Sequence, residues 1–209
     1  KPSIPDLTIN KFTAYLKTIF SSKVFNITLL LIILTYSSIT IFNVTSPFLI
    51  QEYLHKTVVF YGHCAALVGT AWLLGNLLSS MTTQIPNFIR IRASLALIVL
   101  ASLVMLFFHN YLPLLWVYLP CFFVIVVGSG FIFPIAYVSS FAIFPELAGV
   151  MSGVVGSVFW FGGGLVAEVS SYINLQTPVN LFIFHFAVAV LLCLIYIFLL
   201  PKQSALRKP

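Results

Sequence analysis

The chain has 209 residues, of which 61% are hydrophobic and only 7% charged, and its mean hydropathy is +1.11. So few charged residues could not cover the surface of a soluble domain of this length. The formal net charge of +6 does not come from a basic run interleaved with aromatic residues, so nothing indicates a nucleic-acid partner.

Six long apolar runs fill almost the whole chain. A membrane span needs roughly 20 apolar residues, because the hydrocarbon core is about 30 Å thick. Candidate spans cover 25–47, 62–82, 93–109, 114–138, 149–172 and 179–200. The third is short at its apolar centre, so we expect it to include flanking residues. The sequence therefore predicts an all-α integral membrane protein with a six-span bundle over residues 25–201.

The basic residues predict the orientation of the chain in the membrane. Of the ten Lys and Arg residues, all but Lys56 fall on one side of the six predicted spans. Basic residues are enriched in cytoplasmic loops, so both termini are expected in the cytoplasm. Residues 202–209 then form a basic cytoplasmic tail.

Residues 1–24 are expected to form a cytoplasmic linker. Over 11–24, apolar residues such as Tyr15 and Ile19 recur at helical spacing with lysines between them. This pattern is typical of an amphipathic helix on the membrane surface, although a plain extension of the first span is an equal alternative. The opening, without an initiator methionine, suggests one half of a longer protein.

The six predicted spans differ in polarity. The third and sixth are nearly pure hydrocarbon and can face lipid, whereas the other four carry Ser, Thr, Asn, Gly, Tyr and Trp. Polar residues in a membrane usually face other helices or a wet cavity. We therefore expect four central and two peripheral helices, in an order that suggests two three-helix units, as in half of a transporter.

Polar and aromatic side chains of the four predicted central spans suggest a substrate cavity. Tyr36 and Asn43 share one face of the first helix, and Trp72 and Asn76 lie one turn apart on the second. An aromatic ring beside an amide offers a flat apolar surface with donor and acceptor groups. The predicted lining residues are Tyr36, Asn43, Trp72, Asn76, Phe133 and Trp160. The alternative is that these residues only join neighbouring helices.

Glycine and proline predict bends and close helix contacts in the fourth and fifth spans. Gly128, Gly130 and Pro134 allow either a gate or a static kink in the fourth. The fifth carries a small-residue surface that predicts close packing, formed by Gly149, Gly153 and Gly156.

Glu168 is the only acidic residue within a predicted span. A carboxylate at the bilayer centre costs about 2.5 kcal/mol or more, so it must find a partner, water or a proton. Glu168 is therefore the first candidate for proton or cation binding, unless it reaches interfacial water. His185 enters the sixth span at a similar depth and could pair with Glu168 and respond to pH, or lie at a helix interface.

No other constellation points to chemistry. Cys64, Cys121 and Cys193 are scattered singly at no metal or redox spacing, and the chain shows no nucleotide loop or nucleophile–base pair. The sequence predicts no enzyme activity, no metal and no cofactor.

Four segments carry a resemblance to a known family. They are 46–52 (SPFLIQE), 61–62 (YG), 128–134 (GSGFIFP) and 144–153 (FPELAGVMSG). In this order and spacing the chain resembles the C-terminal half of a major facilitator superfamily transporter, and is similar to the drug:proton antiporters of the bicyclomycin-resistance (Bcr/CflA) branch.

The resemblance implies half of a twelve-span fold in a bacterial inner membrane, with a cavity between the halves that opens alternately to each side. It implies proton-coupled efflux of drug-like or metabolite substrates. The expected partners are an N-terminal six-helix half, membrane lipids, a small-molecule substrate and protons, and no nucleic acid. The alternative function is a non-transporting scaffold or complex subunit, because six closely packed spans need no cavity.

Overall fold

The computed structural model describes residues 9–111, 113–173 and 177–199, and these residues form helices without any strand. Their elements in chain order are α1 (Ile9–Ser21), α2 (Lys23–Pro47), the π-helical η1 (Phe48–Tyr53), α3 (Val58–Met81), α4 (Asn87–Phe108), α5 (Leu114–Phe141), the 3₁₀ turn η2 (Pro145–Leu147), α6 (Ala148–Tyr172) and α7 (Pro178–Leu199).

Within the described residues six helices are long and apolar enough to cross a membrane, which confirms the predicted six-span all-α architecture. The first and third extend furthest beyond their predicted bounds. The first continues past Pro47 through η1, so the whole span covers Lys23–Tyr53. The third begins at Asn87 rather than at residue 93, because its apolar centre is too short to cross the membrane without the preceding turn.

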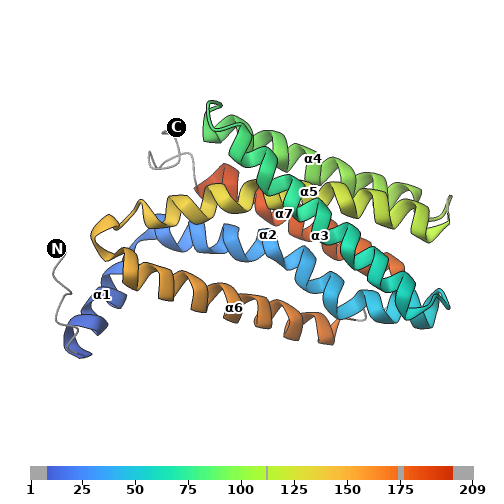
Figure 1. Cartoon of the computed structure of the whole chain (residues 1–209), viewed down its shortest axis with the longest axis horizontal. Helices are drawn as coiled ribbons and strands as arrows, with labels where there is room; N and C mark the ends of the chain where they lie inside the picture. Colours follow the sequence, from blue (N-terminus) through green and yellow to red (C-terminus); the bar gives the residue numbers. More distant parts are fainter. Residues whose placement is uncertain (1–8, 112, 174–176, 200–209) are drawn as a thin grey trace.

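The helix α1 is separate from the first span. Ser22 interrupts the helical path in an extended conformation, and its Oγ accepts a hydrogen bond from the Phe25 N–H at 3.3 Å. This arrangement is a typical N-cap for α2. Figure 1 shows α1 leaving the bundle at a steep angle to α2. The amphipathic stretch is therefore a helix of its own and not an extension of α2.

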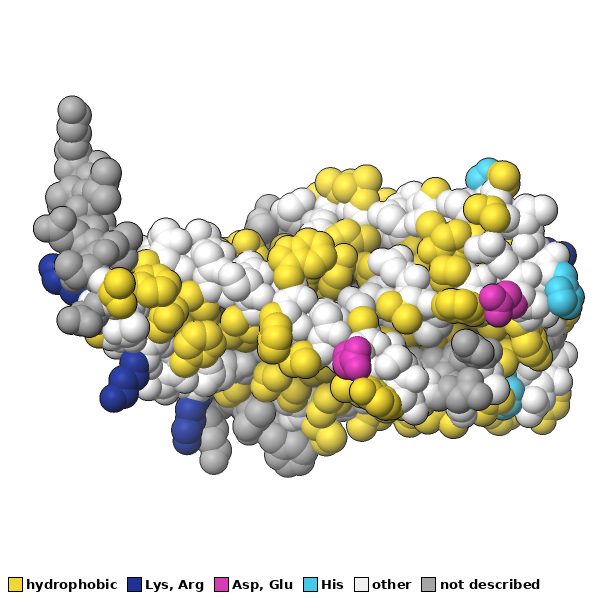
Figure 2. Space-filling view, turned by 90° about the horizontal axis from the view of Figure 1, so that it is seen from below, with side chains coloured by type: hydrophobic (Ala, Val, Ile, Leu, Met, Phe, Trp, Pro, Cys, Tyr) yellow, Lys and Arg dark blue, Asp and Glu magenta, His cyan; other side chains and the backbone are white. Residues whose placement is uncertain are grey.

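The bundle is built around α2 and α5. The helix α5 packs against α2, α3, α4 and α6, while α2 also contacts α6 and α7, and α7 packs on α4. Figure 1 shows α6 running along α2 at one edge of the bundle, and the start of α2 at the same end as the end of α7. Seen from the side of α6, the Lys and Arg side chains gather mainly at that end and the histidines at the other (Figure 2).

Burial does not follow the predicted division into four central and two peripheral helices. The most apolar 18-residue windows of α2 and α5 are 56% and 50% buried, but those of α3 and α6 are only 22% buried. The windows of α4 and α7 are 39% and 44% buried, because these two helices cover each other. Within this chain, small and polar residues of α3 and α6 such as Gly69 and Ser152 point outward. Whether these two helices are central in a larger assembly stays a prediction.

A buried arginine joins three helices at the end of the bundle where α2 begins. Arg90 of α4 donates to the backbone oxygen and to Oγ of Ser79 on α3, the latter at 2.8 Å, and to Oδ1 of Asn87 at 2.8 Å. Its guanidinium also lies over the ring of Phe131 on α5, 5.3 Å from the centroid. Arg90 is 7% exposed, and these polar contacts replace much of the water that its guanidinium loses, although Nε has no partner among the described residues.

Two glycines bring the backbones of α3 and α5 into direct contact. A Cβ added to Gly75 would collide with the carbonyl oxygen of Val127 and lie 2.9 Å from the carbonyl carbon of Gly130. A Cβ on Gly130 would lie 2.8 Å from the carbonyl oxygen of Trp72. Backbone atoms cannot turn aside as a side chain can, so any larger residue must push the two helices apart.

We expect Gly75→Ala to destabilise the protein by about 1–3 kcal/mol, the usual cost of overpacking a close contact. The measurement is the thermal unfolding midpoint of the protein in detergent. Gly69→Ala is the matched control, because it lies on the same helix and its added Cβ would meet nothing within 4 Å. Equal midpoints for the two variants would contradict the close contact.

Candidate functional site

Four aromatic side chains from four different helices form a closed set of ring contacts, which we call the aromatic cluster. Tyr36 of α2 lies 5.6 Å from Trp72 of α3 and 4.7 Å from Phe159 of α6, measured between ring centroids. Phe133 of α5 completes the set, 5.1 Å from Trp72 and 5.6 Å from Phe159. These spacings are those of favourable tilted and edge-to-face pairs.

The close helix contacts position these rings. Trp72 lies almost one turn before Gly75 on α3, and Phe133 lies three residues after Gly130 on α5, so the backbone contact brings both rings together. On the other flank, a Cβ on Gly162 would lie 2.6 Å from two carbons of the Ile33 side chain. Because Ile33 precedes Tyr36 and Gly162 follows Phe159 by three residues each, that contact aligns the second pair of rings.

The aromatic cluster lies at mid-depth of the bundle. At a rise of about 1.5 Å per residue, its rings lie roughly 12–20 Å along their helices from the end where α2 begins. The middle of a hydrocarbon core about 30 Å thick falls within this range. The cluster therefore lies at about the depth of the bilayer midplane.

All four rings of the aromatic cluster are partly exposed. This distinguishes them from the aromatic residues near the opposite end, because Tyr118, Phe122 and Phe182 are each fully buried. A partly exposed set of rings leaves aromatic faces and edges available to another molecule. The cluster is thus a surface on which a flat apolar group can stack.

Polar groups border the aromatic cluster on two helices. The Asn76 Nδ2 donates to the carbonyl oxygen of Trp72 at 2.9 Å, and a Cβ on Gly130 would lie 3.3 Å from the same Nδ2. The amide therefore lies beside the α3–α5 contact. On α2, the Thr40 Oγ1 donates to the carbonyl oxygen of Tyr36 at 3.4 Å.

The structure places Tyr36, Trp72, Asn76 and Phe133 together, but it separates the other two predicted lining residues from them. Trp160 is 69% exposed and touches the cluster only through Phe159, at 5.3 Å between centroids. Asn43 is exposed and lies about two turns from Tyr36 along α2, which is roughly 10 Å.

Two aromatic residues of this region were missed by the sequence reasoning. Phe159 closes the cluster, and Tyr137 stacks on Phe133 at 5.7 Å, which extends the aromatic surface along α5. The signal that could have found Phe159 was its place beside Trp160. Trp160 was predicted instead, although its ring points outward and that of Phe159 points into the cluster.

The predicted pair of Glu168 and His185 does not form. Glu168 is exposed on α6, and its Oε1 accepts a hydrogen bond from the Tyr172 hydroxyl at 3.0 Å. His185 is 1% exposed, and its ring lies 5.0 Å from that of Phe122 on α5. The pairing fails because α7 packs against α2 and α4 and turns His185 into the bundle, while Glu168 points outward.

No described residue offers a hydrogen bond to either ring nitrogen of His185. The side chain is enclosed by aromatic rings, with Tyr118 and Phe184 at 6.4 Å and 6.3 Å from it in addition to Phe122. This environment corresponds to the alternative reading of His185 as a residue at a helix interface.

The predicted gating and packing residues fall into two groups. In α5, Gly128 faces Ile98 of α4, where a Cβ would lie 2.6 Å from a side-chain carbon, and Pro134 stands inside an uninterrupted helix beside Phe133. In α6, by contrast, a Cβ on Gly149, Gly153 or Gly156 would meet nothing within 4 Å. These three glycines do not pack against another described helix, so the close packing predicted for them does not occur inside this bundle.

A cavity of about 690 Å³ lies between α1 and α6 beside this glycine face. Tyr15 and Phe20 of α1 line one side, and Gly153 and Ser157 of α6 line the other. The face of α6 that carries Gly149, Gly153 and Gly156 meets no other described helix closely. It therefore stays open from the aromatic cluster to the end of the bundle at which α1 lies.

Comparison with known proteins identifies one family. The model of the Major Facilitator Superfamily matches residues 2–167, which include α1 to the greater part of α6. No curated protein matches the chain significantly.

We expect Phe159→Ala to lower the thermal unfolding midpoint more than Trp160→Ala does. The first variant loses ring contacts with Tyr36, Phe133 and Trp160, each worth about 0.5–1.5 kcal/mol, whereas the second loses only the contact with Phe159. Unfolding in detergent, followed by near-ultraviolet circular dichroism, measures both. A larger loss for Trp160→Ala would mean that the exposed ring, not the cluster, joins the helices.

Proposed function

Because the chain belongs to the Major Facilitator Superfamily, a family of membrane transporters, we propose that it is the C-terminal six-helix half of a secondary transporter. In this proposal the half rocks as a unit against an N-terminal half, so that a central cavity opens alternately to each side of the membrane. The transported molecule is a small drug-like or metabolite compound, and its efflux is coupled to protons.

The single observation that carries this proposal is the aromatic cluster. Transporters of this architecture bind substrate near the bilayer midplane, between helices of different repeats. Tyr36 and Trp72 belong to the first three spans, and Phe133 and Phe159 belong to the last three. A partly exposed surface at mid-depth, shared by both sets of helices, fits that requirement.

The chemistry of the cluster supports a flat and mainly apolar substrate. Its four rings carry no formal charge, so binding rests on stacking and on contacts with ring edges. Aromatic faces also attract organic cations, by about 0.5–2 kcal/mol for each ring depending on how far the site excludes water. Asn76 adds a polar group at the border. Aromatic or cationic drug-like molecules combine these properties.

The open faces of α3 and α6 support a partner bundle. Trp160 and Glu168 both stand exposed on α6, and a carboxylate facing acyl chains would cost several kcal/mol. This face therefore meets protein or water. Gly149, Gly153 and Gly156 leave room for a second helix to approach the α6 backbone. We assign this face to the N-terminal six-helix half.

The same proposal gives Glu168 the role of the titratable group. It is the only acidic residue between the ends of α6, and its described partner is the Tyr172 hydroxyl rather than a cation. At an interface between two halves that opens to water in turn, a carboxylate without a cationic partner can exchange a proton.

In the same proposal both termini face the cytoplasm of a bacterial cell.

A scaffold or complex subunit without transport activity is the second candidate. The contact of α3 with α5 at Gly75 and Gly130 is the observation behind it, since close packing of this kind is what a static bundle needs. An ethidium flux assay distinguishes the two functions. It uses proteoliposomes that contain both halves of the protein, and a scaffold would produce no ethidium flux in them.

In that flux assay we expect Trp72→Ala to reduce ethidium transport at least tenfold, because it removes the ring that links the rings of α2 and α5. Asn76→Ala should reduce it less. The matched control is Leu73→Ala, which changes an exposed neighbour of Trp72 that lies outside the cluster. Wild-type flux in both Trp72→Ala and Asn76→Ala would remove the cluster from the substrate pathway.

The coupling role of Glu168 has a separate test in the same vesicles. We expect the pH dependence of ethidium flux, measured between pH 5 and pH 8, to flatten in Glu168→Gln, because glutamine cannot exchange a proton. Glu146→Gln is the control, since Glu146 is exposed in η2, away from the middle of α6. An unaltered pH profile in Glu168→Gln would exclude this carboxylate as the coupling group.

A further inference from the structure

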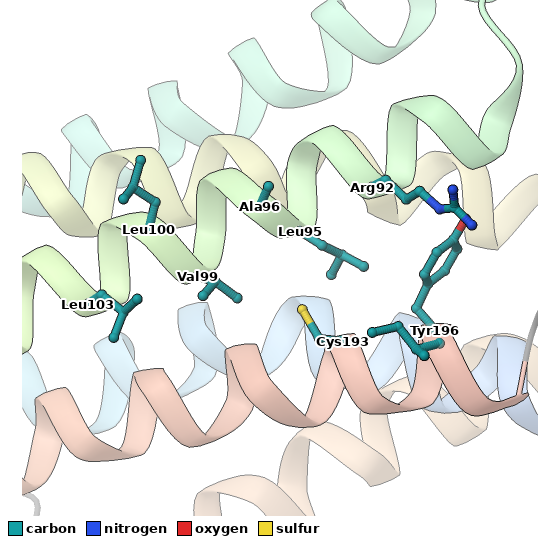
Figure 3. A pocket seen from close by; sticks show the side chains of 9 residues that line it. Arg92, Leu95, Ala96, Val99, Leu100, Leu103, Cys193 and Tyr196 are labelled. Atoms are coloured by element: carbon teal, nitrogen blue, oxygen red, sulfur yellow. The ribbon is translucent and has the colours of Figure 1, made fainter.

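An apolar groove of about 650 Å³ runs between α4 and α7, on the part of the bundle not assigned to a partner half. Figure 3 shows α4 on one side, α7 on the other, and Arg92 with Tyr196 at one end. The lining residues are Arg92, Leu95, Ala96, Val99, Leu100, Leu103, Cys193, Tyr196 and Ile197. Apart from Arg92 and the Tyr196 hydroxyl, they offer only apolar groups.

The length of the groove corresponds to one leaflet of a bilayer. Arg92 and Leu103 mark its two ends on α4, and at about 1.5 Å per residue they are roughly 16 Å apart along the helix axis. Half of a hydrocarbon core about 30 Å thick is roughly 15 Å. A single acyl chain that starts at the level of Arg92 therefore reaches the far end of the groove near the middle of the membrane.

The polar end of the groove is a cation held in place by aromatic rings. The Arg92 guanidinium carbon lies 5.7 Å from the ring centroid of Phe88 and 5.9 Å from that of Tyr196. The Tyr196 hydroxyl in turn donates to the carbonyl oxygen of Phe88 at 3.2 Å. Among the described residues no carboxylate pairs with this guanidinium, whose contacts are with the two rings.

We propose that this groove is a binding site for one anionic phospholipid, with an acyl chain between α4 and α7 and its phosphate on Arg92. The guanidinium is an exposed positive charge at the membrane surface, oriented by its two rings, and it presents paired N–H donors that suit phosphate oxygens. Each such cation near the surface favours anionic over zwitterionic lipid, and basic pockets between membrane helices are known to bind acidic headgroups.

The charge of Arg92 distinguishes this site from ordinary contact with the bilayer. Any phospholipid can place an acyl chain against Leu100 or Val99, but only a headgroup with net negative charge gains from an unpaired guanidinium. The neighbouring arginine offers no such site, because Arg90 is buried and already donates to Ser79 and Asn87.

The test uses the purified protein in phosphatidylcholine vesicles that contain a minor fraction of photoreactive lipid, with a diazirine halfway along one acyl chain. Photoreactive phosphatidylglycerol and phosphatidylcholine are compared, and adducts are located by peptide mass spectrometry. We expect about fivefold more adducts at the groove residues of α4 and α7 from phosphatidylglycerol. Adducts at Leu191, an exposed residue of α7 outside the groove, provide the internal reference.

Two pairs of variants complete the experiment. Arg92→Gln should lower the phosphatidylglycerol yield to that of phosphatidylcholine, while Lys23→Gln, which removes an equal charge at the same end of the bundle, should not. Ala96→Trp should lower the yield from both lipids by filling the groove, while Leu97→Trp, on the same helix outside the groove, should not.

Equal groove yields for the two lipids in the wild-type protein would overturn the proposal, because the groove would then be ordinary lipid-facing surface. A wild-type yield in Arg92→Gln, or an equal loss in Lys23→Gln, would overturn it as well. Arg92→Lys keeps the charge and should retain most of the preference, which provides a reading if Arg92→Gln fails to fold. None of these results depends on transport activity.

Discussion

The direct contact between the backbones of α3 and α5 determines where the aromatic rings can meet. Inside a bilayer, apolar side chains gain little by leaving lipid for protein, so helices associate through close van der Waals contact and through hydrogen bonds. Gly75 and Gly130 bring the backbones of two helices together, and an added Cβ at either would come closest to a backbone atom of the other helix. This contact determines the positions of the Trp72 and Phe133 rings. Each residue lies about one turn from its glycine, so the two rings meet in the space beside the contact.

The bundle presents two kinds of surface, and their side chains differ in what they can face. On α6, the exposed carboxylate of Glu168 needs water or protein beside it, and the open glycines leave room for another helix. The groove between α4 and α7 is lined mainly by apolar side chains, and its one charge is Arg92 in the second turn of α4, from which a long side chain can reach the headgroup region. Arg92 and Glu168 both lie within about two turns of a helix end, where long polar side chains can reach the interface, so the two surfaces differ in chemistry rather than in depth.

The spans and the fold class could be predicted from the sequence because length and hydropathy determine them, whereas the rotation of each helix could not. The third and sixth spans are almost uniformly apolar, so no face of them indicates which side is buried. For the fifth, the choice of Trp160 over Phe159 depended on a rotation of about 100° between adjacent residues. Tyr36 and Trp72 could be found because their helices carry no other aromatic side chain near mid-depth, whereas Phe133 lies among several aromatic residues of α5.

The failure of the pair between Glu168 and His185 has the same origin. Equal depth along two helices brings two side chains together only if the helices are neighbours and both faces turn inward, and depth is the only one of these conditions that a sequence shows. In the structure the two residues lie apart. His185 packs against Phe122 inside the bundle, and Glu168 lies on the exposed face of α6. A rigid bundle with one fully enclosed imidazole and one outward carboxylate can move as a unit without breaking an internal ion pair. In the proposed cycle, the change of protonation therefore takes place at the interface between the two halves and not in the interior of this half.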